Sequence, residues 1–159
     1  MKYDGSNYKW GYQIKEFEER HEWFKLQLDP SQSRRPSSLA ARYPSDYALP
    51  PSYDVPCEKL VVDYLTALRG NAEAYLLEKL GEVVLRTTPR EWIITIPAIW
   101  SDSARAKTLA CAEKAGMGSG SKLHVISEPE AAAMYVLQAM DPHGINIGDT
   151  FVVCDAGGG

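Results

Sequence analysis

The residues with the clearest chemical potential lie in segment 151–159, which reads FVVCDAGGG. β-branched and aromatic residues favour a buried strand, so Asp155 is expected at the carboxyl end of one. Open α/β sheets bind their ligands at that end. Three glycines lack Cβ atoms, so their backbone N–H groups could approach an anion, as in phosphate-binding loops. The same pattern is typical of a flexible glycine linker, and spacing alone does not separate the two interpretations.

A second carboxylate stands where another helix is expected to begin. Glu128 is followed by Pro129, and proline is favoured in the first turn of a helix. A glutamate at this position also interacts favourably with the helix dipole, which explains it without any ligand. Taken by itself, the pattern favours this structural interpretation.

The elements that must position these residues alternate between helical and strand patterns from residue 58 onward. Proline at position 97 closes one strand, Ser101 or Asp102 can cap the next helix, and Gly81 and Gly116 are suited to ending helices. This order predicts an α/β fold with helices packed on a sheet. The expected elements are a helix over 58–79, a buried strand over 92–96, a helix to about 115, a strand over 123–126, a helix from 128 and a strand over 151–154.

The first third of the chain is less regular. Alternating aromatic and polar residues over 3–14 predict a strand or hairpin, and residues 15–28 have a helical pattern. Residues 29–56 are rich in proline, serine and tyrosine and have little periodicity. So long a loop is uncommon in a compact domain, which predicts an extended, disorder-prone insertion.

The composition of the 159 residues is that of one globular domain, with 45% hydrophobic and 24% charged residues. A net charge of −4 gives no electrostatic reason to expect nucleic acid or an anionic membrane as partner. No apolar run approaches the ~20 residues of a membrane span. The three cysteines (57, 111 and 154) form no CxxC pair, and the three histidines lack metal-ligand spacing. We therefore expect reduced, mostly buried thiols, no zinc site and a cytoplasmic location.

Four segments in order resemble the nucleotide-binding domain of the 70-kilodalton heat-shock chaperone family, within the actin-like ATPase superfamily. The resemblance covers about residues 57–159, whereas residues 1–56 match loosely and indicate a divergent member. It implies an α/β fold of the actin-like ATPase (ribonuclease H-like) type, with an incomplete mixed sheet flanked by helices. The matching segments are 71–76 (NAEAYL), 94–98 (ITIPA) with Asp102 and Arg105, 127–133 (SEPEAAA) and 155–159 (DAGGG).

The resemblance implies roles for individual residues in binding ATP or ADP with Mg²⁺. Asp155 would hold a water of the magnesium shell or orient the attacking water, and Glu128 would be a second carboxylate beside the metal. Lys25 would stand for the catalytic lysine of the family, although a solvated lysine explains that residue equally well. Carboxylates and Mg²⁺ suit phosphoryl transfer, which depends on positioning and charge neutralisation. The remaining implied roles are phosphate binding by Gly157, Gly158 and Gly159 and interdomain coupling by Pro97 and Arg105.

The chain also departs from the family pattern. The first phosphate loop, an aspartate-glycine-threonine hairpin, would precede residue 1, and neither the threonine after the second loop nor the adenosine-binding half is present. Glu130 replaces a threonine of the signature, which would bring negative charge near the phosphates if it faced inward. Residues 117–121 lengthen the turn before the signature. No peptide-binding domain is present.

We therefore expect one incomplete domain, with residues 1–90 as the peripheral part of lobe I, 91–148 as its core, and 149–159 as the first strand and phosphate loop of lobe II. A fragment of a chaperone ATPase, inactive alone, is one hypothesis. The second is a non-enzymatic interaction module or degenerate ATPase. The third is an unrelated α/β nucleotide binder, but such a protein should carry an early GxGxxG motif, which this sequence lacks. Expected partners are nucleotide, co-chaperones and client proteins.

Overall fold

The computed structural model describes residues 1–30, 55–139, 146 and 148–154. Most of the insertion expected over 29–56 lies outside the described residues. So do Asp155 and the glycine loop that follows it.

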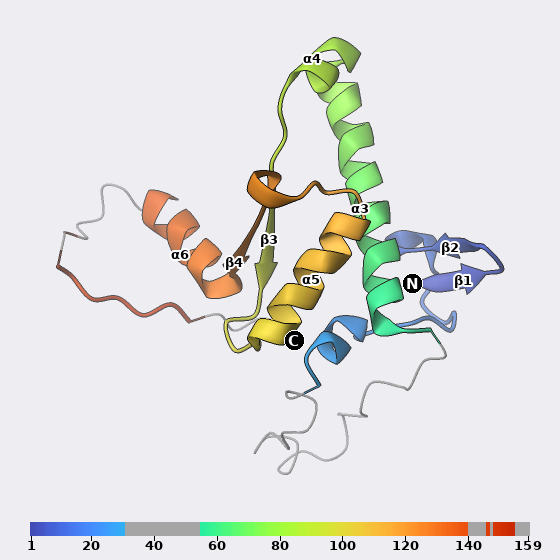
Figure 1. Cartoon of the computed structure of the whole chain (residues 1–159), viewed down its shortest axis with the longest axis horizontal. Coiled ribbons are helices and arrows are strands. Elements are labelled where there is room, and N and C mark those ends of the chain that lie inside the picture. Colours follow the sequence, from blue (N-terminus) through green and yellow to red (C-terminus); the bar gives the residue numbers. More distant parts are fainter. Residues whose placement is uncertain (31–54, 140–145, 147, 155–159) are drawn as a thin grey trace.

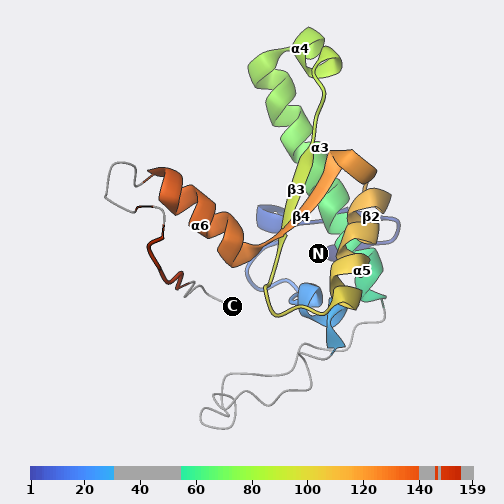
Figure 2. The same cartoon turned by 60° about the vertical axis from the view of Figure 1, so that its left-hand side comes forward.

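A two-stranded parallel sheet and two helices form the centre of the molecule (Figure 1). Strand β3 (Trp92–Ile96) pairs with β4 (Leu123–Ser127), so that Trp92 lies opposite Leu123 and Ile96 opposite Ser127. Helix α5 (Asp102–Lys114) joins the two strands and packs against α3 (Cys57–Leu80). Helix α6 (Glu128–Ala139) leaves the end of β4 on the side away from α3, as Figures 1 and 2 both show.

The core lies on one face of this sheet. One cluster joins Leu28, Val61 and Cys111, and a second joins Ala112, Met117 and Leu123. Within β3, Ile96 is buried, but Ile93 on the opposite face is 65% exposed. The prediction of a buried strand over 92–96 is therefore right in its boundaries and wrong in its burial, because the described residues cover only one face.

The predicted boundaries of α3 and α5 and the predicted start of α6 are confirmed. Ser101 Oγ accepts a hydrogen bond from the Ala104 N–H at 3.3 Å, which caps α5. Gly81 and Gly116 follow α3 and α5 with φ angles of 80° and 81°, a conformation that favours glycine. A short helix, α4 (Glu82–Thr87), and a 3₁₀ turn, η3 (Gly120–Lys122), were not predicted.

The predicted hairpin is present but short. Strand β1 (Lys2–Asp4) pairs with β2 (Asn7–Lys9) in antiparallel fashion, and a 3₁₀ turn, η1 (Gly11–Gln13), follows. Tyr3 Oη donates a hydrogen bond to Asp63 Oδ2 at 2.6 Å, which attaches the hairpin to α3. Burial and this hydrogen bond raise the pKa of Tyr3.

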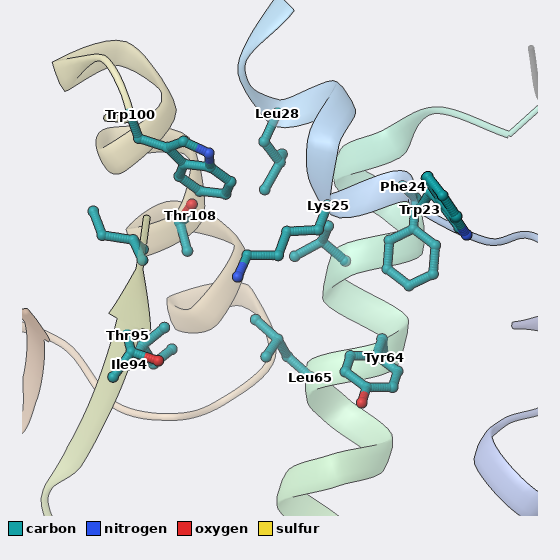
Figure 3. Close-up of a pocket in the computed structure, with 12 residues that line it drawn as sticks. Trp23, Phe24, Lys25, Leu28, Tyr64, Leu65, Ile94, Thr95, Trp100 and Thr108 are labelled. Atoms are coloured by element: carbon teal, nitrogen blue, oxygen red, sulfur yellow. The ribbon is translucent and has the colours of Figure 1, made fainter. Parts of the chain in front are cut away.

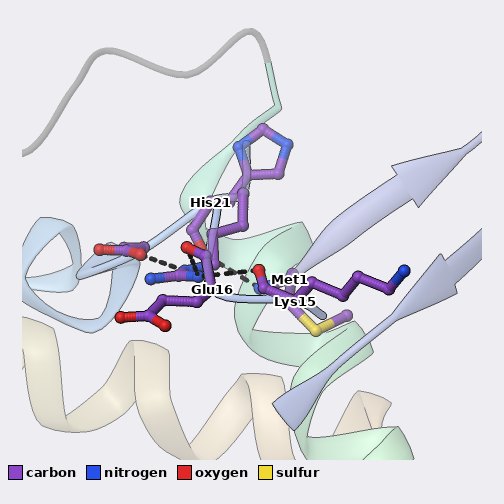
Figure 4. A network of polar contacts seen from close by, with 6 residues as sticks. Met1, Lys15, Glu16 and His21 are labelled. Carbon is purple, nitrogen blue, oxygen red and sulfur yellow. Dashed lines mark hydrogen bonds and ion pairs between the residues drawn. The ribbon is translucent and has the colours of Figure 1, made fainter. Parts of the chain in front are cut away.

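The helix predicted over 15–28 is wrong. The segment contains only a 3₁₀ helix, η2 (Phe24–Leu28), preceded by turns. The backbone of His21 donates to the Met1 carbonyl at 2.7 Å, and the Arg20 guanidinium donates to the carbonyls of Lys15 and Glu16 (Figure 4). These hydrogen bonds hold the segment in a non-helical conformation, because together they stabilise it more than its modest helix propensity would stabilise a helix.

The strand predicted over 151–154 is also absent. These residues have no regular secondary structure, and Val152 is 90% exposed. A strand needs a neighbour for its backbone hydrogen bonds, and no described segment lies beside it in a ladder. Cys154 is accordingly exposed, which corrects the expectation of mostly buried thiols, while Cys111 is buried and Cys57 half-buried.

Candidate functional site

The carboxyl ends of β3 and β4 meet at one edge of the sheet because the strands are parallel. Pro97 follows β3 at this edge, and Glu128 follows β4 as the first residue of α6. Lys25 reaches the same edge from η2, although 103 residues separate it from Glu128. Its Nζ lies 2.5 Å from Glu128 Oε1, so two of the candidate residues from the sequence form an ion pair.

Both members of this ion pair keep contact with solvent. The side chain of Lys25 is 50% exposed and that of Glu128 is 31% exposed. Ion pairs with such exposure contribute about 0–1 kcal/mol to stability. Fold stabilisation alone is therefore a weak explanation for bringing these two charges together at the strand ends.

Lys25 also contacts an aromatic ring and an apolar pocket. Its Nζ lies 5.7 Å from the centroid of the Trp100 ring, a cation–π distance. Its aliphatic stem extends from η2 toward β3 across a pocket of about 260 Å³ (Figure 3). Among the described residues that line this pocket, most are apolar, such as Leu28, Leu65 and Ile94. The size and the mostly apolar lining suit an apolar group better than a whole nucleotide.

Glu130 does not join the Lys25–Glu128 pair. Its Oε2 accepts from the N–H and the hydroxyl of Ser127 at 3.4 Å, and the Glu130 N–H donates to Ser127 Oγ at 3.3 Å. This reciprocal arrangement is a capping box at the start of α6. The motif S-x-x-E over 127–130 is the sequence signature of this cap, so the role of Glu130 was predictable from the sequence.

Pro97 and Arg105 lie on either side of the connection between β3 and α5. The Pro97 carbonyl accepts from the Trp100 N–H at 3.2 Å in a turn. The Arg105 guanidinium donates to the Val125 carbonyl at 2.9 Å, which ties α5 to β4. The interdomain coupling expected of these two residues stays a prediction.

Asp29, a buried residue near the site, is not among the candidate residues from the sequence. Its side chain is 2% exposed, and Oδ2 accepts from the backbone N–H of Ser101 at 2.9 Å. Its position in sequence assigned it to the start of the insertion, and no periodic pattern marks it. Buried carboxylates are uncommon, because burying a charged group is costly unless it is paired or hydrogen-bonded.

The remaining candidate residues are not placed by the structure. Asp155, Gly157, Gly158 and Gly159 lie outside the described residues, so their positions relative to Glu128 stay predictions. In the described part of the chain, no cluster of three or more His, Cys, Asp or Glu residues could hold a metal ion. None of the described helices combines the length and apolar character needed to cross a bilayer.

The chain is similar to a heat shock protein 70 homolog of Acanthamoeba polyphaga mimivirus. The two are 28% identical over 145 residues, which is 91% of this chain but 14% of that protein. The chain therefore spans about one-seventh of the relative's length. No protein-family model matches the chain, and no solved structure does. The comparison supports a distant relation to heat shock protein 70 homologs.

Proposed function

We propose that this chain supplies one wall of the magnesium–ATP site of a heat-shock-70-like ATPase. The observation that carries the proposal is the Lys25–Glu128 pair at the carboxyl ends of two parallel strands. Open α/β sheets bind ligands at such an edge. The similarity to a heat shock protein 70 homolog supports the same assignment.

The residue types at this edge suit phosphoryl transfer. The Lys25 ammonium would face the phosphates and neutralise charge that develops during hydrolysis. The Glu128 carboxylate would hold Lys25 in place and accept hydrogen bonds from water beside the metal. Among the described residues Glu128 alone supplies a carboxylate here, so Mg²⁺ would be held mainly through waters and phosphates, where it would neutralise phosphate charge.

Further parts of the proposal concern the glycine loop, the two coupling residues and the partners of the complete protein. Asp155 would contact the magnesium water shell, and Gly157, Gly158 and Gly159 would donate backbone N–H groups to the phosphates. Pro97 and Arg105 would couple nucleotide state to a neighbouring domain. Clients and co-chaperones would be the partners of the complete protein.

The test compares this chain with a version extended by its natural flanking sequence. We expect no tight Mg-ATP binding by the chain alone, because one wall cannot hold the phosphates from both sides. The extended protein should bind Mg-ATP in calorimetry and hydrolyse it. There, Lys25→Ala and Glu128→Gln should each lower turnover ~100-fold or more, as loss of a group that stabilises the transition state does.

Lys79→Ala is the matched control, since Lys79 is a half-exposed lysine at the far end of α3. It should leave turnover unchanged. Micromolar binding by the short chain would contradict the one-wall proposal. Absence of binding by the extended protein would instead favour a degenerate ATPase or an interaction module.

A further inference from the structure

We propose that Asp29 is a positioning residue that holds Lys25 against Glu128. This inference rests on the proposed function, in which Lys25 faces the phosphates. Asp29 directly follows η2, the 3₁₀ helix that carries Lys25. Its buried carboxylate binds the backbone N–H of Ser101, the residue that precedes α5.

The hydrogen bond of Asp29 connects the two chain segments that surround the lysine. Ser101 comes directly after Trp100, and the Trp100 ring lies 5.7 Å from Lys25 Nζ. Leu28, the last residue of η2, directly precedes Asp29. Its side chain is 1% exposed and belongs to the core. Figure 3 shows Leu28, Lys25 and Trp100 around the same pocket. One contact thus fixes both the backbone that carries Lys25 and the ring that it faces.

Helix capping alone does not account for Asp29. Free N–H groups at a helix start attract a carboxylate. However, Ser101 Oγ already caps α5 by accepting from the Ala104 N–H. The N–H that Asp29 binds belongs to the capping residue itself, outside the first turn. The effect of Asp29 is therefore to place η2 relative to α5.

The backbone before Lys25 supports the same conclusion. Trp23 has a φ of 60°, the sole positive value for a non-glycine residue in the described part of the chain. Such a conformation is unfavourable and persists where the surroundings enforce it. The Trp23 side chain is 52% exposed, so burial of its own ring is a weak reason for it. The next ring, Phe24, packs edge-on against Tyr64 at 6.0 Å. Segment η2 is thus fixed at both ends, by Phe24 and by Asp29.

Accurate placement of Lys25 matters for the proposed chemistry. Misplacing a catalytic group by about 1 Å can lower the rate ~100-fold. Both side chains of the pair have many rotatable bonds and partial solvent contact. Without a fixed backbone under Lys25, the ion pair would exchange with solvated conformations.

Zero-length cross-linking measures this placement in the chain as it stands. A carbodiimide activates the Glu128 carboxylate, the Lys25 amine displaces the urea, and an amide forms where the two groups touch. Mass spectrometry quantifies the linked peptides. The ion pair between Lys2 of β1 and Glu18, at 3.1 Å, shares no residue with the site and gives an internal reference.

We expect Asp29→Ala to lower the Lys25–Glu128 amide yield roughly fivefold relative to the reference, the change that loss of one hydrogen bond produces. Asp29→Asn keeps an acceptor without the charge and should give an intermediate yield. Asp102→Ala removes an exposed carboxylate from the first turn of α5 and should match the unmodified chain.

An unchanged yield in Asp29→Ala, with the reference intact, would overturn the inference. Loss of the reference amide in Asp29→Ala would mean that this variant has unfolded. The Asp29→Asn variant then decides. A Lys25–Glu128 amide yield in Asp29→Asn equal to that of the unmodified chain would overturn the inference. In the extended protein, Asp29→Asn should lower ATP turnover more than it raises KM. If that protein shows no ATPase activity at all, the proposed function fails while the cross-linking result still decides the role of Asp29.

Discussion

Cys57 and Glu58, at the first turn of α3, show how local surroundings change the properties of single residues. Burial and a 3.3 Å hydrogen bond from the Cys57 thiol to Glu58 raise the pKa of Cys57 from 9.0 to about 11. The pKa of Glu58 is lowered, first by its own backbone N–H and then by this thiol. Burial likewise raises the pKa of Cys111. These thiols are poor nucleophiles at neutral pH, because the thiolate is the reactive form.

The raised pKa of Cys57 predicts a loss of stability at alkaline pH. The folded state holds the thiol proton more tightly than the unfolded state, so this contribution is complete below pH 9.0 and lost as the pH approaches about 11. Denaturant unfolding at several pH values should show this decline. Cys57→Ala should make it shallower, while Cys154→Ala, at an exposed cysteine, should leave it unchanged. If stability fell equally steeply with pH in Cys57→Ala and Cys154→Ala, the decline would not come from Cys57.

At the scale of elements, α6 differs from α3 and α5. It has no buried residue, and its exposed side chains include Met134 and Tyr135. Helices of this length are marginal in water without tertiary packing. The start of α6 therefore depends on local interactions, of which the Ser127–Glu130 capping box is the clearest.

Removal of this cap should loosen α6 without unfolding the rest of the chain. Ser127→Ala is expected to cost about 1 kcal/mol, the usual value for a lost N-cap. Hydrogen exchange of the amides over 131–139 should then become roughly fivefold faster, as about 1 kcal/mol implies. Ser103→Ala, on the exposed surface of α5, is the matched control. Equal exchange rates in both variants would show that the capping box does not hold the helix.

At the scale of the whole molecule, the described residues cover only one face of the β3–β4 sheet. Large apolar side chains are exposed on the other face and nearby, including Ile93 at 65% and Ile99 at 69%. The outer edges of a two-stranded sheet also leave backbone groups unpaired. This is consistent with the expectation of an incomplete sheet, which stays a prediction because no solved structure matches.

The exposed surface predicts self-association of the isolated chain and binding of hydrophobic dyes. Ile93→Thr keeps a β-branched side chain on this surface and should reduce both without loss of stability. Ile96→Thr, at a position that is 4% exposed, should instead destabilise the fold by about 1–3 kcal/mol. Light scattering, dye fluorescence and thermal unfolding measure these effects. A sharp, cooperative transition from a monodisperse monomer would contradict the prediction.

Periodicity and end signals in the sequence determined α3, α5, α6, β3 and β4. Each of these helices has a local start or stop, such as Ser101 or Gly116, and the strands are short β-branched runs between such signals. These features act within a few residues, so they can be predicted without any tertiary structure. The capping interaction of Glu130 is also local, because its partner Ser127 lies three residues away.

Tertiary structure alone decided where Lys25 and Asp29 lie. Local propensity favours a helix over 15–28, but long-range contacts replace it with turns and η2, which carry Lys25 to Glu128. The Asp29 bond to Ser101 spans 72 residues. No short-range pattern encodes such pairs, since they depend on how α3, α5 and the sheet pack. The strand expected over 151–154 failed for the same reason: apolar residues form a strand where a partner ladder exists, and the sequence of a strand does not specify its neighbour.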